Sequence, residues 1–434
     1  MIRHRQLKSG IPGTSGWNFW RAACAVLIAS NAAAAEDWPQ FRGPTGQGHS
    51  TERGLPLDWS ETRNVVWKTP VPGAGWSSPA IAGGRAWLTT AVGDSLRALA
   101  FDPATGRELV NVEVFRADRP GNINPKNSRA SPTPIVDGDR VYVHFGAEGT
   151  AALTTTGEIL WRTRLRYDSQ HGGGGSPALH DGMLIINCDG NADEAFVVAL
   201  DARTGKTRWK TARRSPAGQA YSTPLVIRTG DRDAVISVGA FRTAAYDPAT
   251  GKEIWRVSYG DGFSNVPRPV YGHGLVYLSA GFQQPALLAV RTDGAGDVTK
   301  THVAWTLQRG APYTPSPLLV GDELYLVNDT GIATCVDAKT GVLRWQHRVG
   351  GNHSASPVYA DGDLFPERRR RGDGDRPRSG VPDAVNQPAR RLDAGIDGDF
   401  RRVDLHPDEQ PPVPDWSSVV RLKPDATDSV YTLR

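Results

Sequence analysis

The sequence predicts an all-β fold, a β-propeller of four-stranded blades, and three observations lead to that prediction. A phrase of the form D-x-x-T-G-x-x-x-W recurs, as in DPATGKEIW at 247–255. The tryptophans that mark successive units lie about 40 to 50 residues apart, which is the length of one blade. Each unit also contains a Ser/Thr-Pro or similar Pro element, followed by short β-branched or aromatic runs between Gly/Asp turns, a composition typical of strands.

The recurring phrase has a structural interpretation. The residues that define it are Asp102, Gly106, Trp161, Asp201, Gly205, Trp209, Asp247, Gly251, Trp255, Trp305, Asp337, Gly341 and Trp345. The Asp can accept backbone hydrogen bonds in its own turn, and the Gly can adopt a positive φ. The Trp is large enough to pack as a wedge between neighbouring blades. Residues repeated around a ring cannot all belong to one active site, so we assign them to the fold.

Seven unit starts are visible along the chain. They begin at Ser77, Thr133, Ser176, Ser222, Pro267, Ser316 and Ser356. Each start predicts a strand, a tight turn, two further strands, the D-x-x-T-G turn and a last strand ending near the Trp. Blades bury their apolar faces only against neighbours, so we expect the 434 residues to contain one ring rather than two domains.

Residues 1–35 are expected to be a signal peptide. Basic residues precede the apolar run AACAVLIAS (22–30), and NAAAAED offers an A-x-A site with cleavage after Ala35. The apolar run is too short to cross a bilayer, and no later segment is long and apolar enough to do so. Cys24 follows little apolar sequence, which makes a poor lipoprotein signal. We therefore expect an exported protein, periplasmic or secreted.

Residues 36–365 are expected to form the propeller. Thirteen Trp and 48 Gly suit many short strands and turns. The net charge of +4, with both signs interspersed, does not indicate a nucleic-acid partner. Cys188 and Cys335 fall in strands of the third and sixth units, where a ring would hold them apart as buried free thiols.

Residues 366–434 depart from the pattern. The segment begins PERRRRGDGDRPRSG and is dense in Arg, Asp and Pro, a composition typical of a disordered linker. The strand pattern also ends abruptly after Phe365, which is typical of a frameshift in the coding sequence. A stretch as long as 366–434 could hold the rest of a seventh blade and an eighth. Both interpretations stay open, and an unclosed ring would expose strand edges.

These repeats resemble the PQQ-like β-propeller repeat family, which includes quinoprotein alcohol dehydrogenases and BamB-type outer-membrane assembly factors. DWPQFRGPTGQG (37–48) and HGGGGSPALHDGMLIINCDG (171–190) look especially like secreted, PQQ-binding-like members. The resemblance covers residues 37–364. It implies eight blades, seven with visible starts and one lost in the tail, and it is more specific for fold than for activity.

The connectors from each Trp to the next Pro carry the candidate ligand-binding residues. We expect all of them on one face around the central channel, where converging polar and aromatic side chains would form a binding site. The candidates are Trp76, Asn127, Arg129, His171, Gln219, Tyr221, Asn265, Arg268, Tyr313, Asn352 and His353. The alternative is that they are solvated loop residues or satisfy neighbouring backbone groups.

The sequence indicates no catalytic residue and no metal site. By resemblance, quinoprotein dehydrogenases add a pair of adjacent cysteines, a calcium held by carboxylate and amide groups, and an Asp base. Adjacent cysteines are absent here, and the repeated Asp residues belong to turns. His171 and His353 lie in distant units without ligand spacing. The run Gly172–Gly175 precedes a strand rather than a helix, so we interpret it as close backbone packing instead of an anion loop.

These observations favour an exported, non-catalytic propeller that serves as a protein-interaction scaffold or ligand-binding module, with a protein partner in the cell envelope. This interpretation requires no cofactor, and whether the protein binds PQQ stays open. The alternatives are a PQQ-dependent dehydrogenase and an outer-membrane assembly factor of BamB type. The poor lipoprotein signal argues against a close BamB equivalent and leaves a similar role open.

Overall fold

The structure is a computed structural model. It describes residues 35–57, 63–118, 123–124, 127–169, 171–190, 194–213, 218–260, 262–282, 285–365, 418–422 and 432–433. The chain divides into two units, residues 1–34 and 35–434, and every described residue belongs to the second. The expected signal peptide therefore lies outside the described residues, except for Ala35. Among the described residues, no helix has the length and apolarity needed to cross a bilayer.

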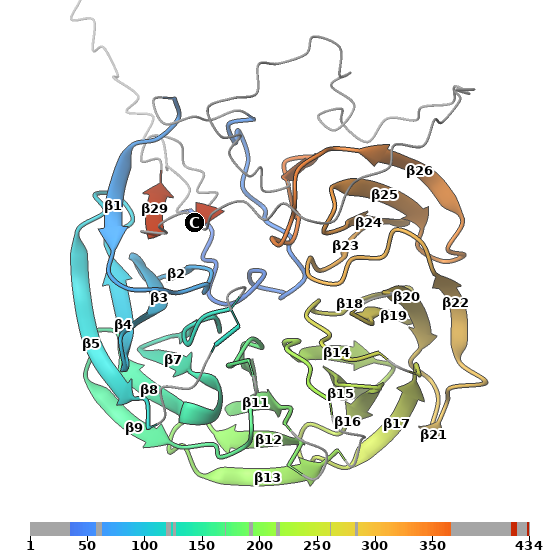
Figure 1. Cartoon of the computed structure of the whole chain (residues 1–434), viewed down its shortest axis with the longest axis horizontal. Coiled ribbons are helices and arrows are strands. Elements are labelled where there is room, and N and C mark those ends of the chain that lie inside the picture. The colour runs from blue at the N-terminus through green and yellow to red at the C-terminus, as the bar shows by residue number, and fades with distance from the viewer. Residues whose placement is uncertain are drawn as a thin grey trace, which may run out of the picture. The chain divides into compact units, whose positions relative to one another are not determined.

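The first three full sheets are antiparallel meanders, in which each strand pairs with the next one along the chain (Figure 1). The first sheet contains β2 (Ala80–Ala82), β3 (Arg85–Val92), β4 (Ser95–Phe101) and β5 (Glu108–Arg116). The second contains β6 (Ile135–Asp137), β7 (Arg140–His144), β8 (Thr150–Thr154) and β9 (Ile159–Thr163), with the short helix η1 (Gly146–Glu148) after β7. The third contains β10 (Ala178–His180), β11 (Met183–Cys188), β12 (Phe196–Asp201) and β13 (Thr207–Ala212).

The next three sheets repeat this plan. The fourth contains β14 (Leu225–Thr229), β15 (Arg232–Val238), β16 (Arg242–Tyr246) and β17 (Glu253–Ser258), and gains the parallel strand β21 (Gly296–Asp297). The fifth contains β18 (Val270–Gly272), β19 (Leu275–Ala280), β20 (Ala286–Arg291) and β22 (Val303–Leu307). The sixth contains β23 (Leu318–Val320), β24 (Glu323–Val327), β25 (Ile332–Asp337) and β26 (Leu343–Arg348). A seventh unit follows as the hairpin β27 (Val358–Ala360) and β28 (Asp363–Phe365).

Within residues 35–434 these sheets follow one another around a common axis (Figure 1). First strands such as β2 and β18 lie near the axis, and last strands such as β5, β9 and β13 lie at the outside. Neighbouring first strands contact each other, as β2 does β6 and β10 does β14. Each of the seven unit starts seen in the sequence leads into one of these first strands.

Strands from the two ends of unit 35–434 share one further sheet. β1 (Trp67–Val71) pairs antiparallel with β29 (Ser418–Leu422), which also pairs with β30 (Thr432–Leu433). Trp67 lies opposite Leu422 and Val71 opposite Ser418. Most of the segment 366–434 lies outside the described residues, so a linker or a frameshift stays a prediction for it. The composition of this segment did not indicate the strands β29 and β30.

Four tryptophans, Trp67, Trp161, Trp209 and Trp305, pack between neighbouring sheets. Trp209 on β13 is only 8% exposed, and its indole Nε1 donates to the carbonyl of Pro248 in the fourth sheet at 2.8 Å. The same bond joins Trp67 to Pro103, Trp161 to Ala202 and Trp305 to Ala338, at 2.9–3.1 Å. The indole thus anchors the last strand of one sheet to the turn of the next.

The repeat glycine is needed for the same contact. Gly251 has φ +70°, and a Cβ there would lie 2.5 Å from Trp209 Cδ2. Gly106, Gly205 and Gly341 have the same relation to the tryptophans Trp67, Trp161 and Trp305. In the first sheet Val110 stands where other copies have Trp, and it faces Gly157 in the same way. The Gly and the Trp of the repeat therefore form one interlock between successive sheets, which we call the Trp–Gly interlock.

The repeat aspartates stabilise their own turns. Asp247 Oδ1 accepts hydrogen bonds from the amides of Ala249 and Thr250 at 3.0 and 2.9 Å, and from the Thr250 hydroxyl at 2.9 Å. Asp337 makes the equivalent three bonds in the sixth sheet. Cys188 on β11 and Cys335 on β25 are buried and free, as expected.

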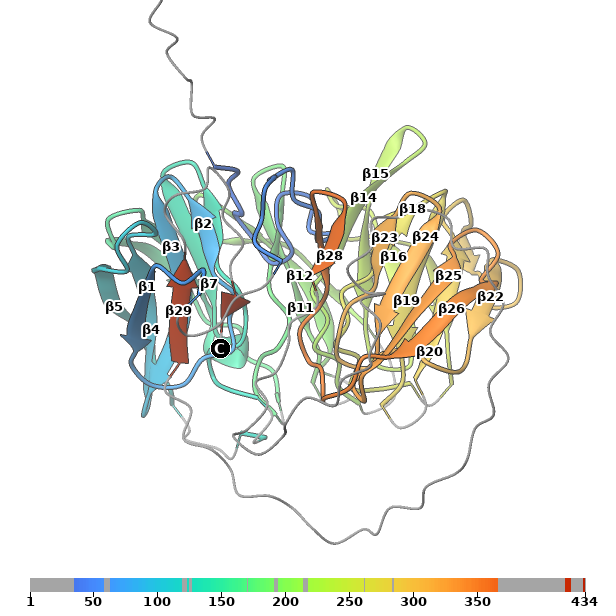
Figure 2. The same ribbon diagram turned by 90° about the horizontal axis from the view of Figure 1, so that it is seen from above.

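Residues 37–50 form a strap that contacts the inner strands of several sheets. Trp38 bridges to Ile81 of the first sheet, and the Pro39 carbonyl accepts from the Val136 amide of the second. Arg42 Nη2 donates to the Pro317 carbonyl at 3.0 Å, before the sixth sheet. Further bonds join Gln47 to Tyr271 and Ser50 to Tyr359, in the fifth and seventh units. Figure 2 shows the strap in dark blue, on the side where the β14–β15 turn projects.

Candidate functional site

The structure brings neighbouring connectors into contact with one another. The Trp76 amide donates to the Ala130 carbonyl at 3.1 Å, and Asn127 Nδ2 donates to the His171 carbonyl at 2.8 Å. The Tyr221 amide donates to the Asn265 carbonyl at 2.7 Å. Since each bond links one connector to the next, these loops lie side by side, and we call the surface formed by the connectors the connector side.

Two candidates, Asn265 and Arg268, are at most 2% exposed and hold the fold. Asn265 is 1% exposed; its Nδ2 donates to the carbonyl of Gly239 at 2.8 Å, and its Oδ1 accepts from the Gly281 amide at 2.7 Å. Arg268 is also buried and donates to the carbonyls of Phe41, in the strap, and Pro224. Burial lowers the pKa of Arg268 to about 9. The geometry supports a structural role for both.

Three other candidates, His171, Gln219 and Tyr221, lie at or beside a small pocket on the connector side. The pocket is lined by Tyr167, Ser169, Gly172–Gly175, Asn187, Asp189 and Ala220–Ser222. The ring of His171 lies 6.4 Å from that of Tyr221, and the Tyr221 hydroxyl donates to Gln219 Oε1 at 2.9 Å. Burial and the nearby Asp189 raise the pKa of Tyr221.

The glycine run beside this pocket allows close packing. A Cβ on Gly173 would lie 2.6 Å from the Cα of Gly146, and one on Gly174 would lie 2.7 Å from the Cβ of Tyr221. A side chain at either position would force backbone or aromatic groups apart. The run therefore lets the connector approach its neighbours closely, and it begins no helix.

The floor of the pocket holds a buried ion pair that sequence reasoning missed. Asp189 Oδ1 lies 3.2 Å from Arg213 Nη1, and both side chains are almost fully buried. Arg213 also donates to Ser237 Oγ, which donates to Asn187 Oδ1 at 2.7 Å. Burial raises the pKa of Asp189 to about 6, against the lowering effect of Arg213. The sequence NCDG (187–190) places polar residues directly after an apolar run, and this was the available sign of a buried polar group. No rule of sequence spacing pairs Asp189 with Arg213.

The remaining candidates are spread over the connectors. Trp76 and Asn352 are exposed, and Arg129 is half-buried. His353 is largely buried, and its Nε2 bonds the Gly350 carbonyl at 2.8 Å. The Tyr313 amide donates to Asp329 Oδ2 at 2.9 Å, which fixes the direction of that connector.

Tyr313 ends a row of aromatic rings that crosses the fourth, fifth and sixth units. Successive ring centroids in the aromatic row Phe241, Phe263, Phe282 and Tyr313 are 6.1, 6.3 and 5.6 Å apart. Phe263 is 39% exposed and Phe282 is 43% exposed. The sequence analysis missed the three phenylalanines. Each of them follows a small residue in a turn or connector, in the tripeptides GAF (239–241), DGF (261–263) and AGF (280–282).

Comparisons with known proteins match this fold. A family model described as outer membrane protein assembly factor BamB matches residues 49–181, 126–293 and 193–373. Serine/threonine-protein kinase AfsK of Streptomyces griseus is 28% identical over 279 residues, which is 55% of this chain and 34% of that protein. Methanol dehydrogenase [cytochrome c] subunit 1 of Paracoccus denitrificans is 27% identical over 250 residues, 46% of this chain and 39% of that protein. The chain thus spans little more than a third of either relative.

A solved structure shares the fold at low identity. The europium-containing methanol dehydrogenase superposes with a TM-score of 0.53 at 11% identity, covering 75% of this chain and 88% of that one. At this identity the likeness concerns the arrangement of strands alone.

Proposed function

The chain belongs to the PQQ-like/BamB β-propeller repeat family, and from that premise we propose that it is a non-catalytic propeller that binds a protein partner through its connector side. The finer parts of this proposal are export to the periplasm or beyond, with residues 1–35 as the signal peptide, and a partner in the cell envelope.

The aromatic row is the observation that carries the proposal. Its rings contact in succession across three units, and Phe263 and Phe282 keep about two-fifths of their surface exposed. Contiguous exposed apolar surface is disfavoured in an isolated soluble protein and marks interaction sites. Aromatic side chains also supply much of the binding energy at protein interfaces. A partner segment laid across the row would bury these rings together.

We also propose that the ring has eight blades. Seven first strands start units along the chain, and the sheet β1–β29–β30 supplies an eighth position built from both ends of the propeller unit. Such pairing would close the ring and remove an exposed strand edge.

A PQQ-dependent dehydrogenase is the second candidate, favoured by the similarity to the methanol dehydrogenase subunit. The pocket at Gly172–Gly175 does not fit an anionic quinone, because its lining presents the carboxyl of Asp189 and neutral groups but no cation. Arg213 is directed to Asp189 instead. Asp189 is itself too buried to act as an accessible base.

A paired capture and titration experiment tests the proposal. The purified chain and the variant Phe263→Ser/Phe282→Ser are immobilised and exposed to envelope extract, with Val342→Ser as the control because Val342 is an exposed apolar residue in a repeat turn. We expect the wild type and the control to retain a shared partner that the double variant loses. Recovery of barrel-assembly components would favour the BamB-type role.

Two results would overturn the proposal. One is equal capture by all three proteins. The other is saturable binding of PQQ with calcium, accompanied by dye-linked alcohol oxidation, which would establish the dehydrogenase instead.

A further inference from the structure

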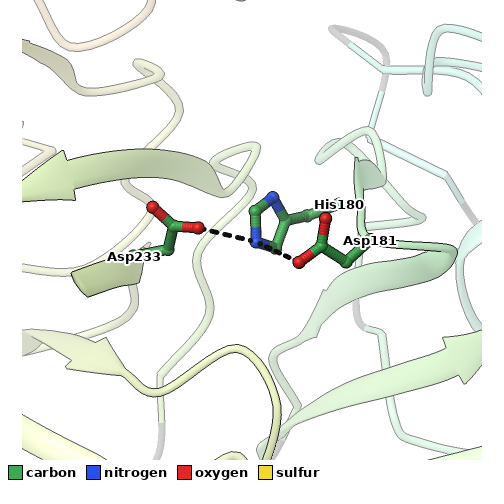
Figure 3. Close-up of side chains that lie close together, drawn as sticks. All are labelled: His180, Asp181 and Asp233. Atoms are coloured by element: carbon green, nitrogen blue, oxygen red, sulfur yellow. Dashed lines mark ion pairs between the residues drawn. The ribbon is translucent and has the colours of Figure 1, made fainter. Parts of the chain in front are cut away.

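Three potential metal ligands meet where the third and fourth sheets adjoin, in the turns that join first to second strands. His180 is the last residue of β10, Asp181 follows it in the turn to β11, and Asp233 lies near the start of β15. Figure 3 shows the imidazole of His180 between the two carboxylates. One ligand atom from each residue lies within 4.8 Å of the other two. This cluster belongs to neither the connector side nor the repeat turns.

The two distances from the imidazole match those between ligands of one small cation, and the two carboxylate oxygens lie within 4.8 Å of each other. His180 Nε2 lies 3.4 Å from Asp181 Oδ2 and 3.3 Å from Asp233 Oδ2. A tetrahedral Zn²⁺ with bonds of about 2.0–2.1 Å separates its ligand atoms by about 3.3–3.4 Å. We propose that His180, Asp181 and Asp233 form a site for a divalent transition-metal ion, with Zn²⁺ as the best fit. Calcium suits it poorly, because it prefers six to eight oxygen ligands.

The position of His180 Nε2 supports a shared cation. His180 Nε2 is buried and makes no hydrogen bond, although carboxylate oxygens lie within 3.4 Å on two sides. A buried nitrogen without a partner is costly. His180 Nε2 thus faces an oxygen of each carboxylate without a hydrogen bond to either, which is the placement of a nitrogen that shares a cation with them.

A second histidine–aspartate pair shows what a purely structural contact looks like in this fold. His273 Nε2 lies 3.3 Å from Asp322 Oδ1 between the fifth and sixth sheets. That nitrogen also bonds the Gly321 carbonyl at 2.9 Å, and Lys339 Nζ pairs with Asp322 Oδ2 at 2.9 Å. His273 therefore has a backbone partner and a single carboxylate, whereas His180 has two carboxylates and no hydrogen bond.

Arg228 orients one of the proposed ligands. Its Nη1 lies 3.0 Å from Asp233 Oδ1, which leaves Oδ2 for the side facing His180. Hydrogen bonds of this kind commonly hold metal-binding carboxylates in place. His180 and Asp233 also line a pocket with Gln40 and Thr45 of the strap. Water from this pocket can supply the fourth ligand, and the ion would link the third sheet to the fourth.

Metal counting on the purified full chain tests the proposal. The protein is stripped with a chelator, dialysed against micromolar ZnCl₂ and analysed for zinc per chain, and Co²⁺ replaces Zn²⁺ to report tetrahedral N/O ligation by visible absorption. We expect one bound ion, an intense Co²⁺ spectrum and a zinc-dependent rise in the melting temperature. His180→Ala should weaken binding at least tenfold and abolish the Co²⁺ spectrum. Asp233→Asn, which keeps the size of the side chain, should do the same if His180→Ala folds poorly.

His273→Ala is the matched control, because it removes a histidine from the equivalent turn two sheets away. It should bind Zn²⁺ as the wild type does. The proposal is refuted if the wild type takes up no zinc under these conditions. It is also refuted if both site variants bind as tightly as His273→Ala.

Discussion

The Trp–Gly interlock makes a quantitative prediction about Gly251→Ala. The alanine would have to keep the backbone φ of +70° that Gly251 has. An L-residue in this left-handed region costs about 1–2 kcal/mol. The new Cβ would also overlap the Trp209 indole, and overpacking of a buried site costs about 1–3 kcal/mol. We therefore expect Gly251→Ala to lower the free energy of unfolding by about 2–5 kcal/mol, the sum of these two costs.

A double-mutant cycle separates the two costs. Trp209→Ala alone should cost about 3–5 kcal/mol, because it removes a buried aromatic side chain. With the indole absent, Gly251→Ala should cost only the backbone term of about 1–2 kcal/mol. The coupling energy is then the overlap term, about 1–3 kcal/mol, with the double variant more stable than the sum of the single effects.

Urea unfolding followed by far-UV circular dichroism measures these values without relying on tryptophan fluorescence. Gly274→Ala is the control, because Gly274 has φ +73° and a Cβ there would meet no atom within 4 Å. Gly274→Ala should lower the free energy of unfolding only by the backbone cost of the positive φ, about 1–2 kcal/mol. Equal losses in Gly251→Ala and Gly274→Ala, or a coupling energy near zero, would contradict the interlock.

Two further predictions concern the buried ion pair and the sheet shared by the chain ends. Burial raises the pKa of Asp189 from 3.8 to about 6. The folded protein therefore binds the carboxyl proton of Asp189 more strongly than the unfolded chain does. This proton stabilises the folded state below about pH 4, and the stabilisation is lost as pH rises through 6. The loss of stability amounts to about 3 kcal/mol for a pKa shift of this size, and Asp189→Asn should abolish it. Wild type and variant whose free energies of unfolding change in parallel with pH would disprove this prediction. Ending the chain after residue 417 removes β29 and β30 and leaves β1 without its described partner, so we expect concentration-dependent association in size-exclusion chromatography. A truncated chain that elutes as the full one does and melts at the same temperature would refute a role for this pairing.

The repeat turn was predictable because its interactions are local. Asp247 bonds groups two and three residues away, so five residues of sequence contain the whole turn. The period then located the strands, since each unit repeats the same order. The second role of Gly251 was not visible in the same way, because the indole that covers it comes from the preceding unit.

The candidate site was less predictable because burial depends on distant loops. Asn265 looked like an exposed amide in a connector, but carbonyls and amides of neighbouring turns occupy both ends of its side chain. Asp189 and Arg213 are 24 positions apart and meet only when β11, β12 and β13 have paired side by side. The pairing of β1 with β29 joins segments from opposite ends of the propeller, and no local pattern could indicate it.

The strap sets an order for folding. Its residues leave the ribosome before those of any described sheet, yet Arg42 bonds a carbonyl 275 positions later in the chain, and Ser50 bonds Tyr359. These bonds can form only after nearly all strands have been synthesised, so the part of the strap from Arg42 to Ser50 must wait while the early units assemble. Contacts of such large separation slow folding, and docking of the strap is expected to be a late kinetic step.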